Sequence, residues 1–410
     1  MSQIRIRDFG PIKSGFEGNQ GFLDIDKITV FIGNQATGKS SVAKLISTFT
    51  WLEKALYRGD LKEKEVSRKN KFEGTYCHYH RLKNYFNPGT EIEYHGSYCS
   101  FYFSHGRLNI ESGQSNNGYK IPKIMYVPAE RNFLSAVDRP EKLKGIPLPL
   151  YTFLSEFDRS QRELSESITL PIGNLKFQYQ KQNKIASILG DGYRVRLLEA
   201  SSGLQSAVPL FIVSQNLASS INKESDTSKK EISIEEEKRI RTEIRKILAN
   251  KRLNDDLKKA ALEELSSKFR SACFINIVEE VEQNLFPVSQ KDMLFKLLEF
   301  ANDTKGNSLV LTTHSPYIVN YLTLAIKGND LLKKINKSHD SRSLLNKFQK
   351  VIPIKSCVSG SEVQVYELED GIIKKLPNFH GIPSDNNYLN KSLADTNSLF
   401  DELLEIEETV

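Results

Sequence analysis

Runs of apolar residues that end in short polar segments are the main pattern along this chain. The clearest runs cover residues 28–32, 124–127, 274–278 and 309–311, and they are rich in the β-branched and aromatic residues that favour strands. Apolar residues at helical spacing follow the first run, and residues 274–327 alternate between strand and helix patterns in the same way. This alternation predicts an α/β fold in which helices flank a mixed sheet.

The remaining segments show other patterns. Residues 72–127 carry Tyr and Phe at alternating positions, which predicts antiparallel strands joined by glycine-bearing turns. Residues 140–170 have a helical pattern, 174–199 alternate like strands, and 397–408 form an acidic amphipathic pattern. Residues 223–270 contain no Gly or Pro and are dominated by Lys, Arg and Glu, with apolar residues at helical intervals. They predict a helical hairpin or short coiled-coil insert, whose charges form either a solvated face or a partner-docking arm.

These patterns divide the chain into five parts. They are an N-terminal lobe (1–139), a helical subdomain (140–222), the charged insert (223–270), a second part of the core (271–330) and a C-terminal region (331–410).

The composition narrows the class of protein. A length of 410 residues with 39% hydrophobic and 26% charged residues is ordinary for a soluble globular protein of two or three structural units. No run of about 20 apolar residues is present, so we expect no membrane span. The 4 cysteines are scattered without a C-x-x-C pair, which indicates reduced thiols in the cytoplasm. A net charge of +6 allows direct contact with nucleic acid but does not require it.

The segment after the first strand matches G-x-x-x-x-G-K-[ST], the phosphate-binding P-loop. A strand, a glycine loop and a helix N-terminus in this order direct backbone N–H groups toward one point, which suits ATP. Lys39 is expected to reach the β- and γ-phosphates, and Ser40 to ligate Mg²⁺. The predicted nucleotide-binding residues are Gly33, Asn34, Gln35, Ala36, Thr37, Gly38, Lys39, Ser40 and Ser41.

Two further strands end in residues suited to phosphate chemistry. The strand at 274–278 is followed by Glu279 and Glu280, the shape of a Walker B motif. Glu279 is expected to hold Mg²⁺, and Glu280 to polarise the attacking water as general base. The strand at 309–311 leads into Thr-Thr-His-Ser-Pro, which resembles the switch-histidine segment of ABC-type ATPases. This resemblance implies that His314, the second predicted catalytic residue, contacts the γ-phosphate.

A fourth segment, Ala-Ser-Ser-Gly-Leu-Gln-Ser at 200–206, precedes an apolar helix. Hydroxyls and N–H groups at a helix N-terminus suit a γ-phosphate. Its predicted nucleotide contacts are Ser201, Ser202, Gly203 and Gln205. Between the P-loop and this segment, the strand at 124–127 ends in Pro-Ala-Glu-Arg, where Glu130 or Arg131 stands in place of a Q-loop glutamine.

Together, the motifs Y-V-P-A-E-R, S-S-G-x-Q, V-E-E-x-E-x-N-L-F-P and T-T-H-S-P resemble those of ABC-type ATPases of the AAA-15/AAA-21 and OLD-like group. The resemblance covers nearly the whole chain and implies an ABC-type P-loop ATPase head. It is strongest to the AriA family of PARIS phage-defence systems, and next to the PtuA family of Septu systems. It implies that the segment at 200–206 is the signature segment of the family. It also implies a homo-oligomer, dimeric at least, in which the signature segment of one copy completes the ATP site of another.

The same resemblance implies an ATPase that holds a toxic nuclease effector of the Toprim type (AriB-like) in trans and releases it on sensing a phage-encoded trigger protein. An alternative is a DNA-repair ATPase of the RecF or Rad50 type, which acts on DNA. A transporter cassette is a third possibility, disfavoured by the missing Q-loop glutamine and by the charged insert. A nuclease effector and DNA-stimulated hydrolysis are the features that separate the first two hypotheses.

Overall fold

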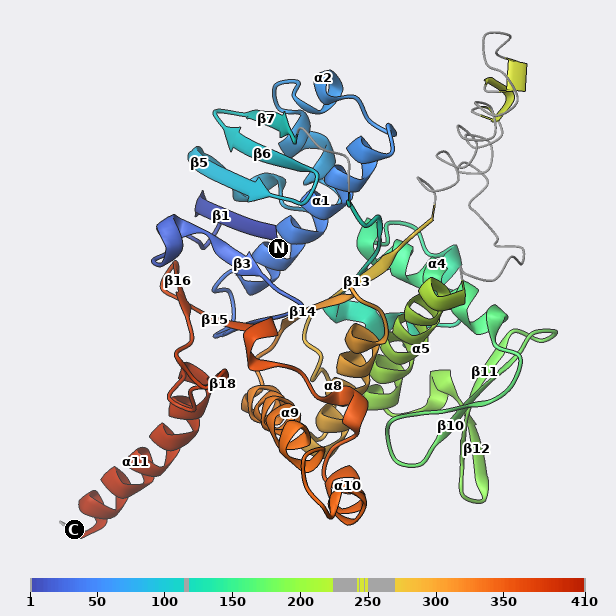
Figure 1. Cartoon of the computed structure of the whole chain (residues 1–410), viewed down its shortest axis with the longest axis vertical. Coiled ribbons are helices and arrows are strands. Elements are labelled where there is room, and N and C mark those ends of the chain that lie inside the picture. The colour runs from blue at the N-terminus through green and yellow to red at the C-terminus, as the bar shows by residue number, and fades with distance from the viewer. Residues whose placement is uncertain are drawn as a thin grey trace.

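The computed structural model describes residues 2–113, 118–223 and 270–408, together with positions 242, 244–246 and 248–249. The predicted insert at 223–270 therefore lies almost entirely outside the described residues. Figure 1 shows an antiparallel sheet with its helices at one end of the molecule and a bundle of helices at the other, joined by the main sheet.

The main sheet has seven strands and is mixed. In spatial order these are β2 (Gly15–Phe16), β16 (Ile372–Lys375), β15 (Val363–Glu369), β4 (Ile28–Gly33), β14 (Ser308–Thr312), β13 (Cys273–Val278) and β8 (Pro122–Val127). The five strands from β15 to β8 run parallel, and β16 returns antiparallel to β15. All six residues of β4 are buried, as expected for an apolar strand covered on both faces. The predicted α/β fold with a mixed sheet and flanking helices is confirmed.

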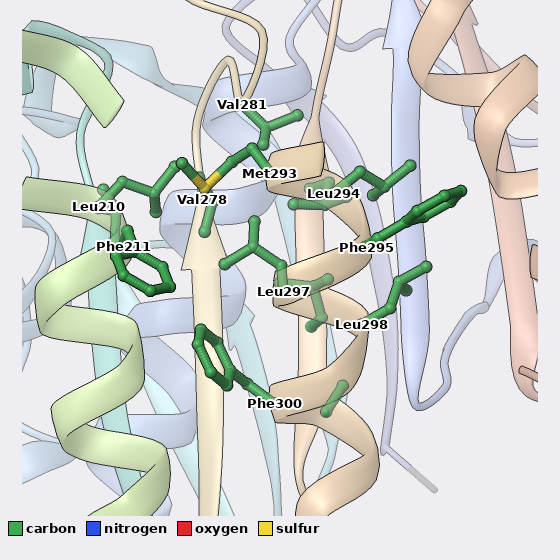
Figure 2. Packing of buried hydrophobic residues seen from close by; sticks show 14 of the residues in the cluster. Leu210, Phe211, Val278, Val281, Met293, Leu294, Phe295, Leu297, Leu298 and Phe300 are labelled. Atoms are coloured by element: carbon green, nitrogen blue, oxygen red, sulfur yellow. The ribbon is translucent and has the colours of Figure 1, made fainter. Parts of the chain in front are cut away.

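Successive residues of β4 point into two different cores, because side chains alternate across a strand. Val30 and Ile32 pack with helices α5 (Ser202–Lys223), α8 (Pro287–Asp303) and α9 (Pro316–Ile335). Phe31 packs in the other core, with α1 (Lys39–Tyr57) and the antiparallel sheet. Figure 2 shows the first core from close by, where α8 lies beside β13 and places Met293 and Leu297 near Val278. The P-loop strand is thus held from both sides.

The aromatic-rich segment forms the antiparallel sheet that the alternation predicts, but the strands begin only at residue 86. This sheet has the order β3 (Leu23–Ile25), β1 (Ser2–Phe9), β5 (Phe86–His95), β6 (Cys99–Ser104) and β7 (Arg107–Ser112). Residues 72–85 form helical turns instead, and α2 (Glu63–Val66) precedes them. Tyr94, Phe101 and Phe103 lie on the buried face of the sheet, where Phe49 of α1 stacks on Tyr94. Tyr98 and Tyr102 are half-buried.

Between the two main-sheet strands β8 and β13 lies the subdomain that carries α5. It contains α3 (Phe133–Ala136), α4 (Leu148–Glu163) and a four-stranded antiparallel sheet of β9 (Ile168–Thr169), β10 (Lys176–Gln180), β11 (Ile185–Gly190) and β12 (Tyr193–Arg196). Pro209 lies inside α5, and this helix packs on α4 and α8.

The C-terminal region returns to the main sheet. After α10 (Ser341–Gln349), the strand β15 pairs with β4, and the hairpin of β17 (Asn378–Phe379) and β18 (Ile382–Pro383) leads into α11 (Tyr388–Glu408). This helix is longer than the acidic pattern at 397–408 predicts, and it projects away from the body of the molecule (Figure 1). In the parts of the chain that the structure describes, no helix is both long and apolar enough to cross a lipid bilayer.

Candidate functional site

The predicted catalytic segments meet at one edge of the main sheet. Strand β14 pairs in parallel with β4 on one side and with β13 on the other, with Thr312 opposite Phe31 and Val278 opposite Leu311. Because parallel strands end at the same edge, the segments that follow them lie together there. These segments are the P-loop, the Glu279–Glu280 pair and His314.

The P-loop backbone requires glycine at both ends of the motif. Gly33 has φ +138°, and a Cβ there would lie 2.3 Å from the carbonyl oxygen of Leu368 in β15. Gly38 has φ +104° and precedes the first residue of α1. Between them, the residues Asn34, Gln35 and Ala36 are exposed, and the Thr37 hydroxyl donates to the Asn34 carbonyl at 2.9 Å. The loop therefore presents an open curve of backbone at a helix N-terminus, as anion binding requires.

Lys39 is buried at the base of this loop. Its Nζ donates to the carbonyl oxygens of Gly33 at 2.9 Å and Asn34 at 2.6 Å. Burial lowers the pKa of Lys39 to about 8, and the negative charges of Glu280 and Glu282 oppose this shift. A buried ammonium held by carbonyls alone gains from an anionic ligand, so the site fits the phosphates of a nucleotide.

Glu279 carries the polar atom that best fits a divalent cation. The residue is only 3% exposed, and its Oε1 accepts no hydrogen bond. Lys44 Nζ lies 3.7 Å from Oε1, and the Ala129 amide donates weakly to Oε2 at 3.4 Å. A buried carboxylate oxygen without a donor is the kind of ligand that Mg²⁺ takes, and Ser40 in the first turn of α1 supplies a hydroxyl.

Among the described residues, no group of three or more His, Cys, Asp or Glu side chains could hold a metal ion. A cation at Glu279 and Ser40 would therefore complete its coordination with phosphate oxygens and water, which is how Mg²⁺ binds at nucleotide sites.

Glu280 and His314 form a pair across the ends of β13 and β14. His314 Nε2 lies 3.4 Å from Glu280 Oε1, and this contact lowers the pKa of the Glu280 carboxyl. The Glu280 amide donates to Thr312 Oγ1 at 3.2 Å, and its backbone has φ +44°. The His314 amide donates to Glu282 Oε1 at 2.5 Å. The arrangement keeps Glu280 ionised and able to accept a proton from water, with an imidazole beside it.

The signature residues lie apart from this cluster. Ser202 begins α5, and both Ser201 and Ser202 are exposed. A Cβ at Gly203 would lie 2.7 Å from the Asn284 carbonyl oxygen, and Gln205 Nε2 donates to the Leu198 carbonyl at 2.9 Å. Within the described ranges, no hydrogen bond joins these residues to the P-loop. Ser201 and Ser202 are therefore open to a phosphate bound by another molecule, whereas Gly203 and Gln205 are held in contacts within this chain.

Arg131 and Tyr388 make hydrogen bonds at the site that the sequence patterns did not predict. Arg131, one of two candidates for the Q-loop position, is completely buried and donates to four backbone carbonyls, whereas Glu130 is exposed. Tyr388, the first residue of α11, accepts a hydrogen bond from P-loop Asn34 Nδ2 at 3.0 Å. The Pro-Ala-Glu-Arg turn was a signal for Arg131, but no local pattern links Tyr388 to a loop 354 residues away.

The structure places an antiparallel sheet beside a mixed sheet, and the P-loop, the Glu279–Glu280 pair and His314 each follow a parallel strand of the mixed sheet. No protein-family model and no curated protein matches the sequence. Among solved structures, the chain is similar to the SMC head domain from Thermotoga maritima, with 10% identity and a TM-score of 0.35 over 92% of this chain and 98% of that chain.

Two other solved structures are similar at the same distant level. A dimeric bacterial ABC transporter cassette has 10% identity and a TM-score of 0.25 over 92% of this chain and 100% of its own. The Smc head domain of Pyrococcus furiosus with an extended coiled coil, bound to the C-terminal domain of ScpA, has 9% identity and a TM-score of 0.33 over 98% and 100%. Similarities this distant assign neither a substrate nor a partner.

Proposed function

We propose that this chain binds ATP with Mg²⁺ and hydrolyses it to ADP and phosphate. The observation that carries this proposal is the meeting of Lys39, Glu279 and the Glu280–His314 pair at the carboxyl edge of β4, β13 and β14. The P-loop amides and Lys39 hold the phosphates, and Ser40 and Glu279 hold the metal. Bound Mg²⁺ supplies charge neutralisation for the transferred phosphoryl group, while Glu280 takes the proton of the attacking water.

The proposed active form contains at least two copies of this chain. Ser202 and Gly203 stand at the exposed N-terminus of α5 and make no hydrogen bond with the P-loop of the same described chain. In the assembly, the α5 N-terminus of a second copy contacts the γ-phosphate bound by the first. ATP then holds the two copies together, and hydrolysis separates them.

In the cell, the proposed role is that of a sensor and scaffold subunit in an antiphage system. The sequence motifs of the PARIS-like ATPases support this role, in which a phage protein triggers release of a nuclease effector held in trans. Helix α11 supplies a docking surface for that effector, since Leu399, Phe400 and Leu403 are 60–62% exposed on a projecting helix (Figure 1). The carboxylates of Asp401, Glu402 and Glu405 beside them favour a partner with an apolar groove edged by basic residues.

The first experiment measures ATP binding, hydrolysis and mass in solution for the wild type, Lys39→Ala and Glu280→Gln. The wild type should hydrolyse ATP, Lys39→Ala should lose binding, and Glu280→Gln should bind ATP and accumulate as the dimer or a larger assembly. Equal hydrolysis by the wild type and Glu280→Gln would remove Glu280 as the base. A monomeric mass for Glu280→Gln with ATP would contradict the shared site.

A second experiment separates the cellular roles. The chain is co-expressed with the products of its neighbouring genes, and DNA-stimulated hydrolysis is measured in parallel. The scaffold role is supported if a nuclease binds stoichiometrically to the wild type. That nuclease should bind less to Leu403→Asp and as strongly as to the wild type to the charge control Glu408→Gln. Hydrolysis that is stimulated by DNA, with no protein partner, favours the repair ATPase instead.

A further inference from the structure

Arg131 is a charged side chain in the interior of the protein, with 0% of its surface exposed. It lies in the short helical turn Ala129–Asn132 after β8, at the same edge of the sheet as the catalytic segments. Burial lowers the pKa of Arg131 to about 10, because the surrounding protein solvates the charge less well than water does. Interior apolar side chains carry no such cost, so packing alone does not explain an arginine here.

The guanidinium joins two segments that carry different parts of the proposed site. Its Nη1 donates to the Glu279 carbonyl and its Nη2 to the Glu280 carbonyl, each at 2.7 Å. Its Nε donates to the Ser206 carbonyl in the second turn of α5 at 3.3 Å. One planar group thus ties the loop of the metal and base carboxylates to the helix that begins with Ser202.

A second bond joins the same two segments. Ser206 Oγ donates to Gln283 Oε1 at 3.0 Å, three residues beyond Glu280. The Glu280 backbone between these bonds has φ +44°, a region that residues other than glycine occupy only at an energetic cost. The surrounding bonds therefore hold Glu280 in a conformation that it would leave if they were released.

We infer that Arg131 is a positioning residue that couples the two halves of the ATP site. It holds the backbone of Glu280 in the orientation for water activation and links that orientation to the position of α5. When Ser202 and Gly203 of one copy engage the nucleotide of the other, the shift of α5 reaches Glu280 of the first copy through Arg131. Hydrolysis at one site then depends on occupancy of the other, which is coupling in the thermodynamic sense.

This inference rests on the proposed ATPase function, and the test separates the two. Arg131→Lys keeps the charge, but its single ammonium cannot span both loop carbonyls and Ser206 in one plane. We expect ATP to bind Arg131→Lys with near wild-type affinity and to dimerise it, while kcat falls by about 10²-fold, the size of effect that a small misplacement of a catalytic group produces. The coupling predicts a Hill coefficient for ATP above one in the wild type, and it should fall to one in Arg131→Lys. The surface control Arg162→Lys should keep both values.

A purely structural role would lower the yield or melting temperature of Arg131→Lys but leave kcat and the Hill coefficient of the folded protein unchanged, and that result would overturn the inference. If Arg131→Lys does not fold, Arg131→Gln decides, because it removes the buried charge and its single amide cannot bond to both the Glu279–Glu280 carbonyls and the Ser206 carbonyl. A reduced Hill coefficient in Arg131→Gln supports the coupling, and an unchanged one overturns it. Absence of hydrolysis by the wild type would overturn the proposed function itself.

Discussion

The position of Lys39 makes nucleotide binding depend on pH in a defined direction. Its ammonium is buried against two carbonyls, and the pKa of Lys39 in the free protein is about 8. Bound phosphates stabilise the protonated form, so ATP binds the protonated lysine. Well below pH 8 the affinity for ATP should not change with pH. Above pH 8 it should fall, because Lys39 must take up a proton before ATP binds.

The magnitude follows from the fraction of free protein that is protonated. With a pKa of about 8, the dissociation constant scales as one plus the ratio of neutral to charged lysine, so affinity falls about tenfold between pH 7 and pH 9. At pH 8.5 binding should take up about 0.8 proton per site. The assay needs a nucleotide whose terminal phosphate is fully ionised from pH 7 to pH 9, so that its own titration does not mask the effect.

The assay is isothermal titration calorimetry with excess Mg²⁺ and the slowly hydrolysed analogue ATPγS, whose terminal thiophosphate is ionised throughout this range, at pH 7, 8 and 9, in two buffers of different ionisation enthalpy. Lys39→Arg keeps its charge over this range, so its affinity should not change with pH, whatever its absolute value. The exposed control Lys64→Arg should keep the wild-type slope. Constant wild-type affinity from pH 7 to pH 9, with no proton uptake, would refute the reasoning.

Three further predictions concern the fold that supports the site. Burial raises the pKa of Glu53 to about 7, so the folded state retains a proton that the unfolded chain releases between pH 4.5 and 7, and stability falls as pH rises through this window. Glu53→Gln should therefore raise stability at pH 8 by up to about 3 kcal/mol in urea unfolding but not at pH 4, with exposed Glu91→Gln as control; a loss at both pH values would contradict this. Ser214→Ala removes the acceptor of the buried Asn276 amide, 2.9 Å away, and should lower the free energy of unfolding by about 1–3 kcal/mol. Adding Asn276→Val to this variant should recover part of the loss in thermal unfolding. An unchanged melting temperature of Ser214→Ala would show that the bond contributes nothing. Gly38→Ala, whose Cβ would lie 2.9 Å from Ile12 Cγ1, should weaken ATP binding far more than Gly59→Ala, which has positive φ but no atom within 4 Å; equal effects would rule out the steric reason.

The sequence by itself determined the strands and the chemistry that lies next to them in the chain. The unbroken apolar run of β4 predicts a strand buried on both faces, and the glycine loop and Lys39 follow it directly. The same holds for Glu279 after β13 and for His314 after β14. These signals are readable because the backbone conformation and the reactive residue lie within a few positions of each other.

Tertiary structure decided which of these segments meet and what connects them. The Asn in strand β13 interrupts an apolar pattern, and its partner Ser214 on α5 becomes evident only when the helix lies against the sheet. Strand β15 joins β4 from the far end of the chain, and its Leu368 carbonyl explains why Gly33 can carry no side chain. Arg131 bonds to carbonyls 148 and 149 residues away. Backbone carbonyls are present at every residue, so periodicity and motif spacing carry no information about which of them a distant guanidinium will reach.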